Sequence, residues 1–198
     1  RKTQLKDPDL GTWTYKVNPL GQSYEQTDAK AQKTTYTFDA LGRLSDRVEA
    51  DQQSHWVYDT GTKGIGKLAE AYTGPVTAKD YQRIHSYDAL GRPAKTITRL
   101  DWDYSTLYAY NGYSQIASQT HRRNTIGLTG GGSDQTYNLS YNNQGAIYQI
   151  KRDSTLLWSR NTQDALGRTT KETFGSGLIT QRDYNDWTGR VESIETGT

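Results

Sequence analysis

Residues 61–68 read Gly-Thr-Lys-Gly-Ile-Gly-Lys-Leu, the stretch of this chain that comes nearest to a chemical motif. A phosphate-binding loop has this density of glycine, but it also needs Ser or Thr after the lysine to hold Mg²⁺ and a helix that starts there. Leu68 stands where the hydroxyl residue should be, and Gly74-Pro75 would end any helix within two turns. We therefore expect no bound nucleotide and interpret these glycines as part of a turn.

The three histidines and one pair of carboxylates are the remaining groups that could do chemistry. His55, His85 and His121 are far apart and do not have the spacing of metal ligands, so we expect satisfied or solvent-facing side chains. Asp101 and Asp103 could form an acid/base pair, but a solvated strand edge explains them better. No nucleophile with a base and an orienting group can be found. The sequence thus predicts no catalytic residue, no metal site and no cofactor, and the protein is not expected to be an enzyme.

A seven-residue sequence, here called the phrase, recurs along the chain. The elements that it forms must position any functional residues. Its clearest copies read FDALGRL at 38–44, YDALGRP at 87–93 and QDALGRT at 163–169. Weaker copies lie at 17–23, 58–68 (with four extra residues), 110–116, 141–147 and 185–191. The glycine slot falls at 21, 42, 66, 91, 114 (a serine), 145, 167 and 189. A step of about 22 residues indicates one supersecondary unit used eight times.

Each phrase has the chemistry of a hairpin turn. The Asp or Asn side chain can accept a hydrogen bond from the backbone two residues later, and the Gly permits a positive φ. Both fit a type I turn followed by a left-handed residue. We expect the arginines to be partners of neighbouring turns or strands. The predicted structural turn residues are Asn18, Gly21, Asp39, Gly42, Arg43, Asp59, Gly66, Asp88, Gly91, Arg92, Asn111, Asn142, Gly145, Asp164, Gly167, Arg168, Asp186, Gly189 and Arg190.

The segments between the phrases alternate as half-buried strands do. Thr34, Tyr36 and Phe38 occupy every second position before one turn, and similar alternation recurs before the others. Residues 67–72 are the best candidate for a helix, and the following Gly-Pro would stop it. The pattern predicts an all-β fold, a repetitive antiparallel meander of hairpins, with the 198 residues forming a single array. Residues 124–134, rich in glycine, are expected to form a flexible loop insertion.

The composition predicts a thin sheet and excludes a thick core. Leu, Ile, Val and Phe make up 31 of 198 residues, whereas Tyr, Trp and Phe together number 22. Such a chain must stabilise its sheet largely through cross-strand aromatic pairs. The balance of 24 basic and 22 acidic residues argues against a nucleic-acid surface. There is no cysteine and no apolar run long enough to span a membrane. The chain begins at Arg1 without any methionine, and we expect it to be a piece of a longer protein.

The phrase Tyr/Phe-Asp-x-x-Gly-Arg-Leu at this spacing resembles the YD repeat of the Rhs family, which includes bacterial Rhs polymorphic toxins, the B–C components of insecticidal toxin complexes and, more distantly, the teneurins. The resemblance covers residues 18–190. It implies a long β-sheet that curves into a hollow shell, which in toxin relatives encloses a C-terminal effector. It also implies a secreted or cell-surface location. The self-cleaving region of those relatives has no match here.

Two functions remain open on this evidence. The leading hypothesis is a non-catalytic segment of the shell, whose partners would be the remaining repeats and the enclosed effector domain. The alternative is an extracellular module that binds carbohydrate or protein through exposed aromatic rings. In either case we expect no nucleic acid partner and no membrane span, and the two open sheet edges favour edge-to-edge self-association.

Overall fold

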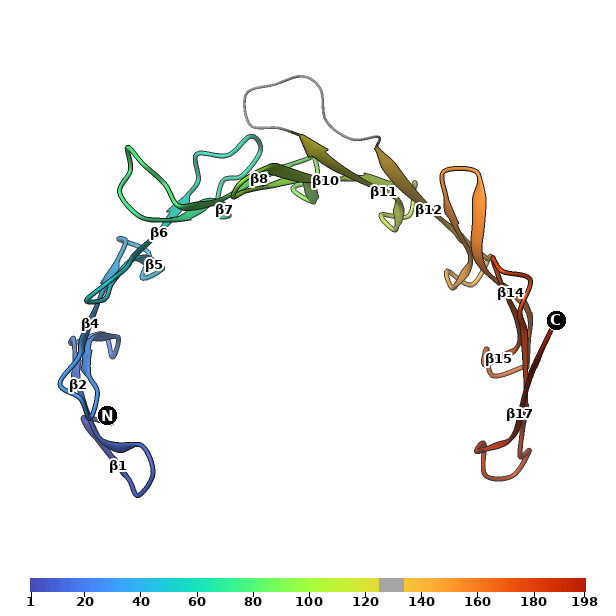
Figure 1. Ribbon diagram of the computed structural model, residues 1–198, viewed down its shortest axis with the longest axis horizontal. Helices are drawn as coiled ribbons and strands as arrows, with labels where there is room; N and C mark the ends of the chain where they lie inside the picture. Colours follow the sequence, from blue (N-terminus) through green and yellow to red (C-terminus); the bar gives the residue numbers. More distant parts are fainter. Residues whose placement is uncertain (125–133) are drawn as a thin grey trace. The chain divides into compact units, whose positions relative to one another are not determined.

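The computed structural model describes residues 1–124 and 134–198, and in this part of the chain every regular element is a β-strand (Figure 1). The predicted all-β fold is confirmed. The chain divides into two compact units, which we describe separately. Among the described residues, the first unit is Arg1–Tyr104, and the second is Ser105–Asn124 with residues 134–198.

The first unit is an antiparallel meander in which each strand pairs with the next one in the sequence. Its strands are β1 (Gln4–Asp7), β2 (Gly11–Val17), β3 (Ser23–Thr27), β4 (Lys33–Phe38), β5 (Leu44–Val48), β6 (Gln53–Tyr58), β7 (Leu68–Thr73), β8 (Tyr81–Tyr87) and β9 (Pro93–Arg99). Leu68–Thr73, which overlaps the best candidate for a helix, is a strand, in agreement with the predicted all-β fold. Leu68–Thr73 pairs with strands on both sides, and this tertiary pairing overrides a weak local helical preference.

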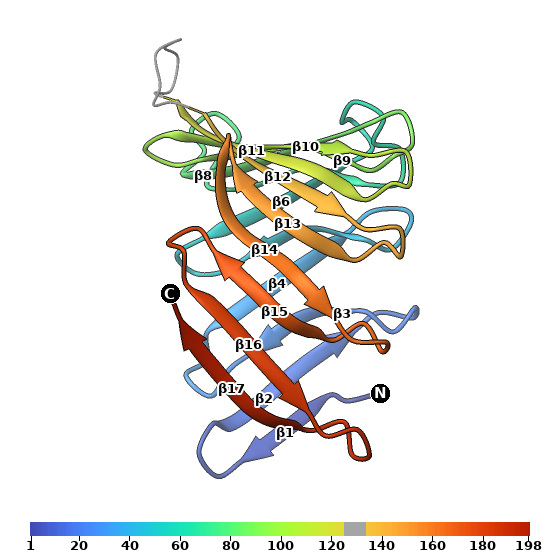
Figure 2. The same ribbon diagram turned by 90° about the vertical axis from the view of Figure 1, so that its right-hand side faces the viewer.

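The second unit repeats the same arrangement (Figure 2). From β11 onwards each strand pairs antiparallel with its successor. The strands are β10 (Asp103–Tyr110, which belongs to this unit from Ser105), β11 (Ile116–Asn124), β12 (Gln135–Tyr141), β13 (Ile147–Arg152), β14 (Thr155–Gln163), β15 (Thr169–Phe174), β16 (Ile179–Tyr184) and β17 (Val191–Gly197). The loop insertion predicted at 124–134 falls almost wholly outside the described residues.

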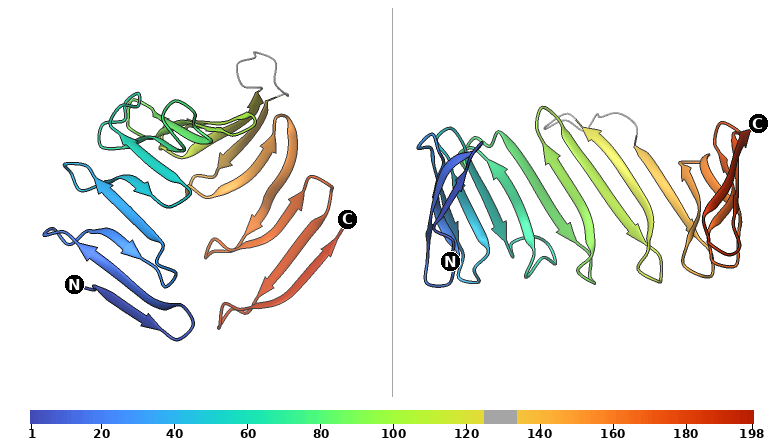
Figure 3. Two further views of the ribbon diagram at one scale, coloured as in Figure 1. Left: turned by 60° about the vertical axis from the view of Figure 1, so that its left-hand side comes forward. Right: turned by 90° about the horizontal axis from the view of Figure 1, so that it is seen from below.

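Each unit is a single layer of strands, as Figure 3 shows. The strands contact their sequence neighbours, and no second layer covers either face within a unit in the described part of the chain. Burial is correspondingly slight, since Ala69 and Tyr72 are the buried apolar side chains among the described residues. No large side chain there is fully buried. Such a sheet has no interior to stabilise it, so cross-strand and turn-to-turn contacts must do so.

The phrase turns all lie at the same end of the strands within a unit, because they join alternate pairs such as β2–β3 and β4–β5. We call this end the phrase rim. A register shift accompanies the phrase in each ladder described there, for example between Thr37 and Phe38 and between Ser86 and Tyr87. A left-handed residue followed by such a bulge is a common way to close a short hairpin. The phrase therefore encodes both the turn and the bulge beside it.

Candidate functional site: the phrase rim

A side-chain cap closes each phrase turn. In the turn after β4, Oδ1 of Asp39 accepts hydrogen bonds from the backbone N–H groups of Leu41 and Arg43, each at 2.9 Å. The N–H of Gly42 donates to the carbonyl of Asp39 at 2.9 Å, and Gly42 has a φ of 78°. A carboxylate in the first position and a left-handed glycine in the fourth thus satisfy the turn internally.

The same cap recurs around both units. Its acceptor is Asn18, Asp39, Asp59 or Asp88 in the first unit and Asn111, Asn142, Asp164 or Asn185 in the second. The residue in the glycine slot has a positive φ in every copy, at Gly21, Gly42, Gly66, Gly91, Ser114, Gly145, Gly167 and Gly189. Ser114 has a φ of 63°, so the turn keeps its left-handed residue even where glycine is missing.

The last turn differs from its predicted form. Asn185, and not Asp186, is the cap, because its Oδ1 accepts from the N–H groups of Trp187 and Thr188 at 3.0 and 2.8 Å. The turn closes with an N–H of Asn185 that donates to the carbonyl of Arg190 at 2.8 Å. This loop is one residue longer than in the DALGR copies. The side chain of Asp186 is therefore free of the capping role that the alignment had given it.

Each capping aspartate in the DALGR copies also holds its own arginine. The distance from Nε of the arginine to Oδ2 of the aspartate is 2.7 Å for Arg43–Asp39, 2.7 Å for Arg92–Asp88 and 2.5 Å for Arg168–Asp164. Burial raises the pKa of Asp39, but the backbone N–H and guanidinium of Arg43 and the N–H of Leu41 together bring that pKa below its ordinary value. The pKa of Asp88 and that of Asp164 are lowered by the same kinds of bond, so these carboxylates stay ionised and bonded to arginine and backbone N–H groups.

The arginine of one turn reaches forward to the next turn. Nη2 and Nη1 of Arg43 lie 2.6 and 3.2 Å from the carboxylate of Asp59, the cap that follows. The hydrogen bond from Arg43 and that from the N–H of Gly66 lower the pKa of Asp59. The guanidinium of Arg43 also stacks on the ring of Tyr58, with 4.2 Å between its carbon and the ring centroid. One side chain thus joins two consecutive hairpins.

Where glutamine replaces arginine, the same two links persist without charge. Nδ2 of Asn18 donates to Oε1 of Gln22 at 2.7 Å, and Nε2 of Gln22 donates to the carbonyl of Gly42 at 2.9 Å. Gln115 copies this arrangement, accepting from Asn111 at 2.8 Å and donating to the carbonyl of the next glycine slot at 3.0 Å. Asp pairs with Arg in three turns and Asn pairs with Gln in two, so in these copies the two positions change together.

Glycine in the fourth position is also required for close approach. A Cβ on Gly42 would lie 3.1 Å from Nε2 of Gln22, the side chain that arrives from the preceding turn. A Cβ on Gly189 would lie 3.1 Å from Nη1 of Arg168, which donates to the Gly189 carbonyl at 2.8 Å. The glycine therefore serves the positive φ and the forward contact together.

The tyrosine before the cap links in the opposite direction. The hydroxyl of Tyr87 donates to the carbonyl of Leu68 at 2.7 Å, just after the preceding turn. Tyr141 and Tyr184 make the equivalent bond, at 2.9 and 3.2 Å, to the carbonyls of Ile116 and Thr169. Burial raises the pKa of the Tyr87 hydroxyl. The tyrosine therefore bonds its turn to the preceding turn, whereas the aspartate closes its own turn.

The link changes at Ala146, which has no side chain to reach forward. The residue before the next cap is Gln163 instead of tyrosine, and its Nε2 donates to Oε1 of Gln144 at 2.8 Å. The bond between Gln163 and Gln144 thus links the two turns although Ala146 cannot reach forward and no tyrosine precedes the next cap. We call the whole set of backward and forward bonds within each unit the turn ladder.

The residues that the sequence offered as candidates for binding or catalysis have structural partners. Strand β7 begins at Leu68, so no helix N-terminus faces the glycines of residues 61–68. Nδ1 of His55 lies 2.7 Å from Oδ1 of Asp46, and the ring stacks on Tyr72. Asp103 pairs with Arg99 at 3.1 Å. The histidine contact is a cross-strand one, as the paired register of these strands requires.

The described residues contain no group of three or more His, Cys, Asp or Glu side chains that could hold a metal ion. Among them there is also no helix long and apolar enough to cross a membrane.

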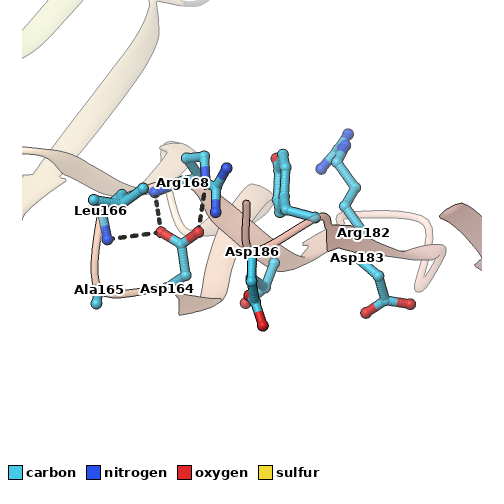
Figure 4. A pocket seen from close by; sticks show the side chains of 9 residues that line it. Asp164, Ala165, Leu166, Arg168, Arg182, Asp183 and Asp186 are labelled. Atoms are coloured by element: carbon cyan, nitrogen blue, oxygen red, sulfur yellow. Dashed lines mark hydrogen bonds and ion pairs between the residues drawn. The ribbon is translucent and has the colours of Figure 1, made fainter. Parts of the chain in front are cut away.

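Shallow hollows lie between successive phrase turns in the second unit. One is lined by Asp164, Arg168 and Tyr184 and extends to Arg182, Asp183 and Asp186. Figure 4 shows the capping carboxylate of Asp164, which accepts hydrogen bonds from the backbone N–H groups of Leu166 and Arg168 and from Nε of Arg168. We call this charged site the ionic hollow. A second one, between turns 111–114 and 142–145, is lined by amides and tyrosines, and we call it the amide hollow.

Exposed apolar side chains stand at the tips of the phrase turns. The third position is 73–96% exposed wherever it is apolar, in Leu20, Leu41, Ile65, Leu90, Tyr113, Leu166 and Trp187. These residues, the glutamines and the tyrosines before each cap were not among the predicted site residues. An alignment of the internal copies contains the signal for the glutamines, because Gln follows Asn in two copies and Arg follows Asp in three others.

Comparison with solved structures supports this architecture. No protein-family model and no curated protein sequence matches the chain. The fold matches that of the TcdB2-TccC3-TEV crystal structure, with a TM-score of 0.76, 16% identity, and coverage of 98% of this chain and 10% of that one. The complex without its hypervariable C-terminal region matches equally, with a TM-score of 0.76 and 15% identity over 98% and 10% of the two chains.

A third match is the Tc holotoxin pore of Photorhabdus luminescens, with a TM-score of 0.54, 15% identity, and coverage of 96% of this chain and 11% of that one. The chain thus spans about a tenth of the length of the solved chains that it matches. At this level of identity the likeness establishes the fold.

Proposed function

Because the chain has the fold of a stretch of the TcdB2–TccC3 toxin shell, which supports its assignment to the Rhs/YD-repeat family, we propose that it is a non-catalytic wall segment of an Rhs-type β-shell. Its partners would be the other repeats of that shell and an effector enclosed by them. Its place of action would be outside the producing cell.

The observation that carries this proposal is the turn ladder. The cap and the fifth residue of a DALGR turn close their own hairpin or tie it to a neighbour, as Arg43 ties Asp39 to Asp59. A sheet one layer thick gains little from burial, so a wall must be stabilised along its rim. Carboxylates that are already occupied by arginine and backbone N–H groups are suited to this role and unsuited to catalysis.

Limited proteolysis of the longest polypeptide that contains this chain tests the proposal, because an enclosed segment is protected from the protease. A segment C-terminal to the repeats should resist limited proteolysis in the intact polypeptide and should be digested when expressed alone. Combined Arg43→Ala and Arg168→Ala substitutions, which cut the ladder once in each unit, should expose that segment. Equal digestion of the enclosed and the isolated segment would rule out encapsulation.

A second candidate function is an extracellular module that binds carbohydrate or protein. The exposed aromatic tips favour it, since Tyr113 and Trp187 are 89% and 96% exposed. Flat rings in solvent are common in recognition surfaces. This function and the wall role are compatible, because the tips take no part in the turn ladder.

A further inference from the structure

Asn111 caps the first phrase turn of the second unit and is followed by Gly112, and this is the one Asn-Gly pair in the sequence. Every other asparagine precedes a residue that has a side chain. The backbone nitrogen that follows an asparagine can attack the side-chain Cγ and close a five-membered ring. Glycine hinders this closure least, because it has no Cβ and its backbone is free to rotate.

The cap prepares the Cγ of Asn111 for such an attack. Its Oδ1 accepts hydrogen bonds from the backbone N–H groups of Tyr113 and Gln115, at 2.9 and 3.0 Å. When a nucleophile adds to Cγ, negative charge develops on this oxygen, and two fixed N–H donors stabilise that charge as an oxyanion hole does. Nδ2 donates to Oε1 of Gln115 at 2.8 Å, a bond that becomes stronger when Nδ2 takes up the proton with which it leaves.

The attacking nitrogen is open to solvent, and water can reach the reacting carbon. Gly112 is exposed, and the structure gives its N–H no acceptor among the described residues. A Cβ on Gly112 would meet no atom within 4 Å, so the space around its backbone is open. Asn111 lines the amide hollow, whose volume of about 630 Å³ is large enough to hold water beside the side chain. Ring closure and the hydrolysis that follows it are therefore both sterically possible in the folded chain.

Two other asparagine caps separate the effect of the cap from that of the next residue. Asn142 has the same cap, with two backbone N–H bonds to its Oδ1 at 3.0 and 2.9 Å, but the following Asn143 has a Cβ beside the nitrogen that must attack. Asn18 is followed by Pro19, whose nitrogen carries no hydrogen and cannot become the nucleophile. Among these three caps, Asn111 alone combines the activated carbon with an unhindered nitrogen.

From this combination, we propose that Asn111 is a self-modification site at which the chain loses ammonia. The nitrogen of Gly112 gives up its proton to solvent and bonds to Cγ, and the bond between Cγ and Nδ2 breaks as ammonia leaves. Water then opens the resulting succinimide at either of its carbonyl carbons, which gives aspartate or isoaspartate at position 111. A molecule of water is consumed for each ammonia released, and nothing is oxidised or reduced.

The two products affect the turn differently. Aspartate keeps an oxygen in the place of Oδ1 and can cap the turn as Asp39 does. Isoaspartate carries the main chain through Cβ and Cγ, which adds a carbon to the backbone of the turn and moves the capping oxygen. The forward bond from Gln115 to the carbonyl of Gly145 depends on this turn, so isoaspartate should cut the turn ladder there. This modification goes beyond the wall role and does not depend on it.

Ageing of the whole chain in its folded state tests the site. After incubation at about pH 8, trypsin should release residues 100–122 as a peptide that is heavier by about 1 Da in a growing fraction of molecules. Fragmentation in the mass spectrometer should place the change at Asn111 and separate aspartate from isoaspartate. We expect conversion at Asn111 to be about tenfold or more faster than at Asn142 in the same sample. Equal rates at the two caps, or conversion only after unfolding in urea, would overturn the proposal.

Two variants serve as controls. Gly112→Ala keeps Asn111 and its cap and places a Cβ in open space, so it should fold normally and convert about tenfold or more slowly. Freshly purified Asn111→Asp represents the aspartate product alone.

Thermal unfolding then reports the effect on the turn. The midpoint should fall in the aged natural chain and not in aged Gly112→Ala, and it should lie below that of Asn111→Asp, because isoaspartate breaks the cap. Conversion of Gly112→Ala at the natural rate would refute control by the next residue. An aged natural chain that melts as the fresh one does would refute the cut in the turn ladder.

Discussion

The guanidinium group of Arg43 lies over the ring of Tyr58, 4.2 Å from its centroid, although the two residues belong to different hairpins. Arg168 and Tyr184 repeat this relationship at the same distance in the second unit. The contact explains why the phrase begins with tyrosine and ends with arginine. In both cases the arginine contacts the tyrosine of the next copy, so the repeated phrase joins neighbouring hairpins.

Loss of the Arg43 side chain should destabilise the first unit. Arg43→Ala removes the bonds to Asp39 and Asp59 and the stack on Tyr58, and it leaves two carboxylates without their partner. We expect a lower midpoint in thermal unfolding followed by circular dichroism. Arg83→Ala is the matched control, because Arg83 is exposed and its side chain has no hydrogen bond or ion pair in the described structure. Equal midpoints for the two variants would show that the ladder contributes nothing to stability.

Acid should weaken the turns capped by aspartate. The pKa of each of Asp39, Asp88 and Asp164 is lowered in the folded chain, so their contribution is complete above the unfolded value, near 4, and is lost as the pH falls through the folded value. The double variant D39N/R43Q adopts the neutral pair that the chain uses at Asn18 and Gln22. Its unfolding midpoint should fall less steeply than that of the natural chain between pH 4 and pH 2. Parallel acid profiles would contradict the assigned role of Asp39.

Glycine in the fourth position should resist substitution by any residue with a Cβ. Gly167 has a φ of 80°, and a Cβ there would meet no atom within 4 Å, so Gly167→Ala measures backbone strain alone. We expect a loss of about 1–2 kcal/mol in denaturant unfolding, and a similar or greater loss for valine at Gly42, Gly91 or Gly167. Gly112 is equally open but lacks a positive φ, so Gly112→Ala should be neutral or slightly stabilising. A neutral Gly167→Ala would mean that the turn is of another type.

The backward bond of the tyrosine should be measurable by removing one oxygen. Tyr87→Phe deletes the hydrogen bond to the Leu68 carbonyl and keeps the ring, so we expect a loss of about 0.5–1.5 kcal/mol in denaturant unfolding. Tyr24 is 41% exposed, and the described structure gives its hydroxyl no partner. Tyr24→Phe is thus a suitable control and should change the free energy of unfolding very little. The prediction fails if both substitutions have the same effect.

Free sheet edges should make the chain self-associate. β17 pairs with β16, and no other strand of the second unit pairs with it in the described part of the chain. An edge of this kind exposes a row of backbone donors and acceptors. Sedimentation over a wide concentration range should reveal dimers or larger assemblies. Charges on the edge, in V191K/I194K, should shift this equilibrium towards monomer without lowering the thermal midpoint, because both side chains are exposed. A natural chain that stays monomeric throughout would refute edge pairing.

The sequence alone was sufficient to predict the hairpins. The bonds that close a phrase turn join residues two to four positions apart, such as Asp39 to Leu41 and Arg43. Local chemistry of this range depends on residue type and order, so Asp, Gly and the alternation of the flanks indicated turns, strands and an all-β fold. Where the local pattern was ambiguous, as between Asn185 and Asp186, loop length decided which side chain became the cap.

Only the tertiary structure could decide what each turn touches. The bond between Arg43 and Asp59 spans 16 residues, and that between Gln115 and Gly145 spans 30, so both depend on strand lengths and register. The same placement left Tyr113 exposed above a hollow with no charge, whereas Leu166 stands above a charged one. Side chains far apart in the sequence meet only when the sheet brings their turns together, because pairing between strands is a long-range interaction that no single phrase encodes.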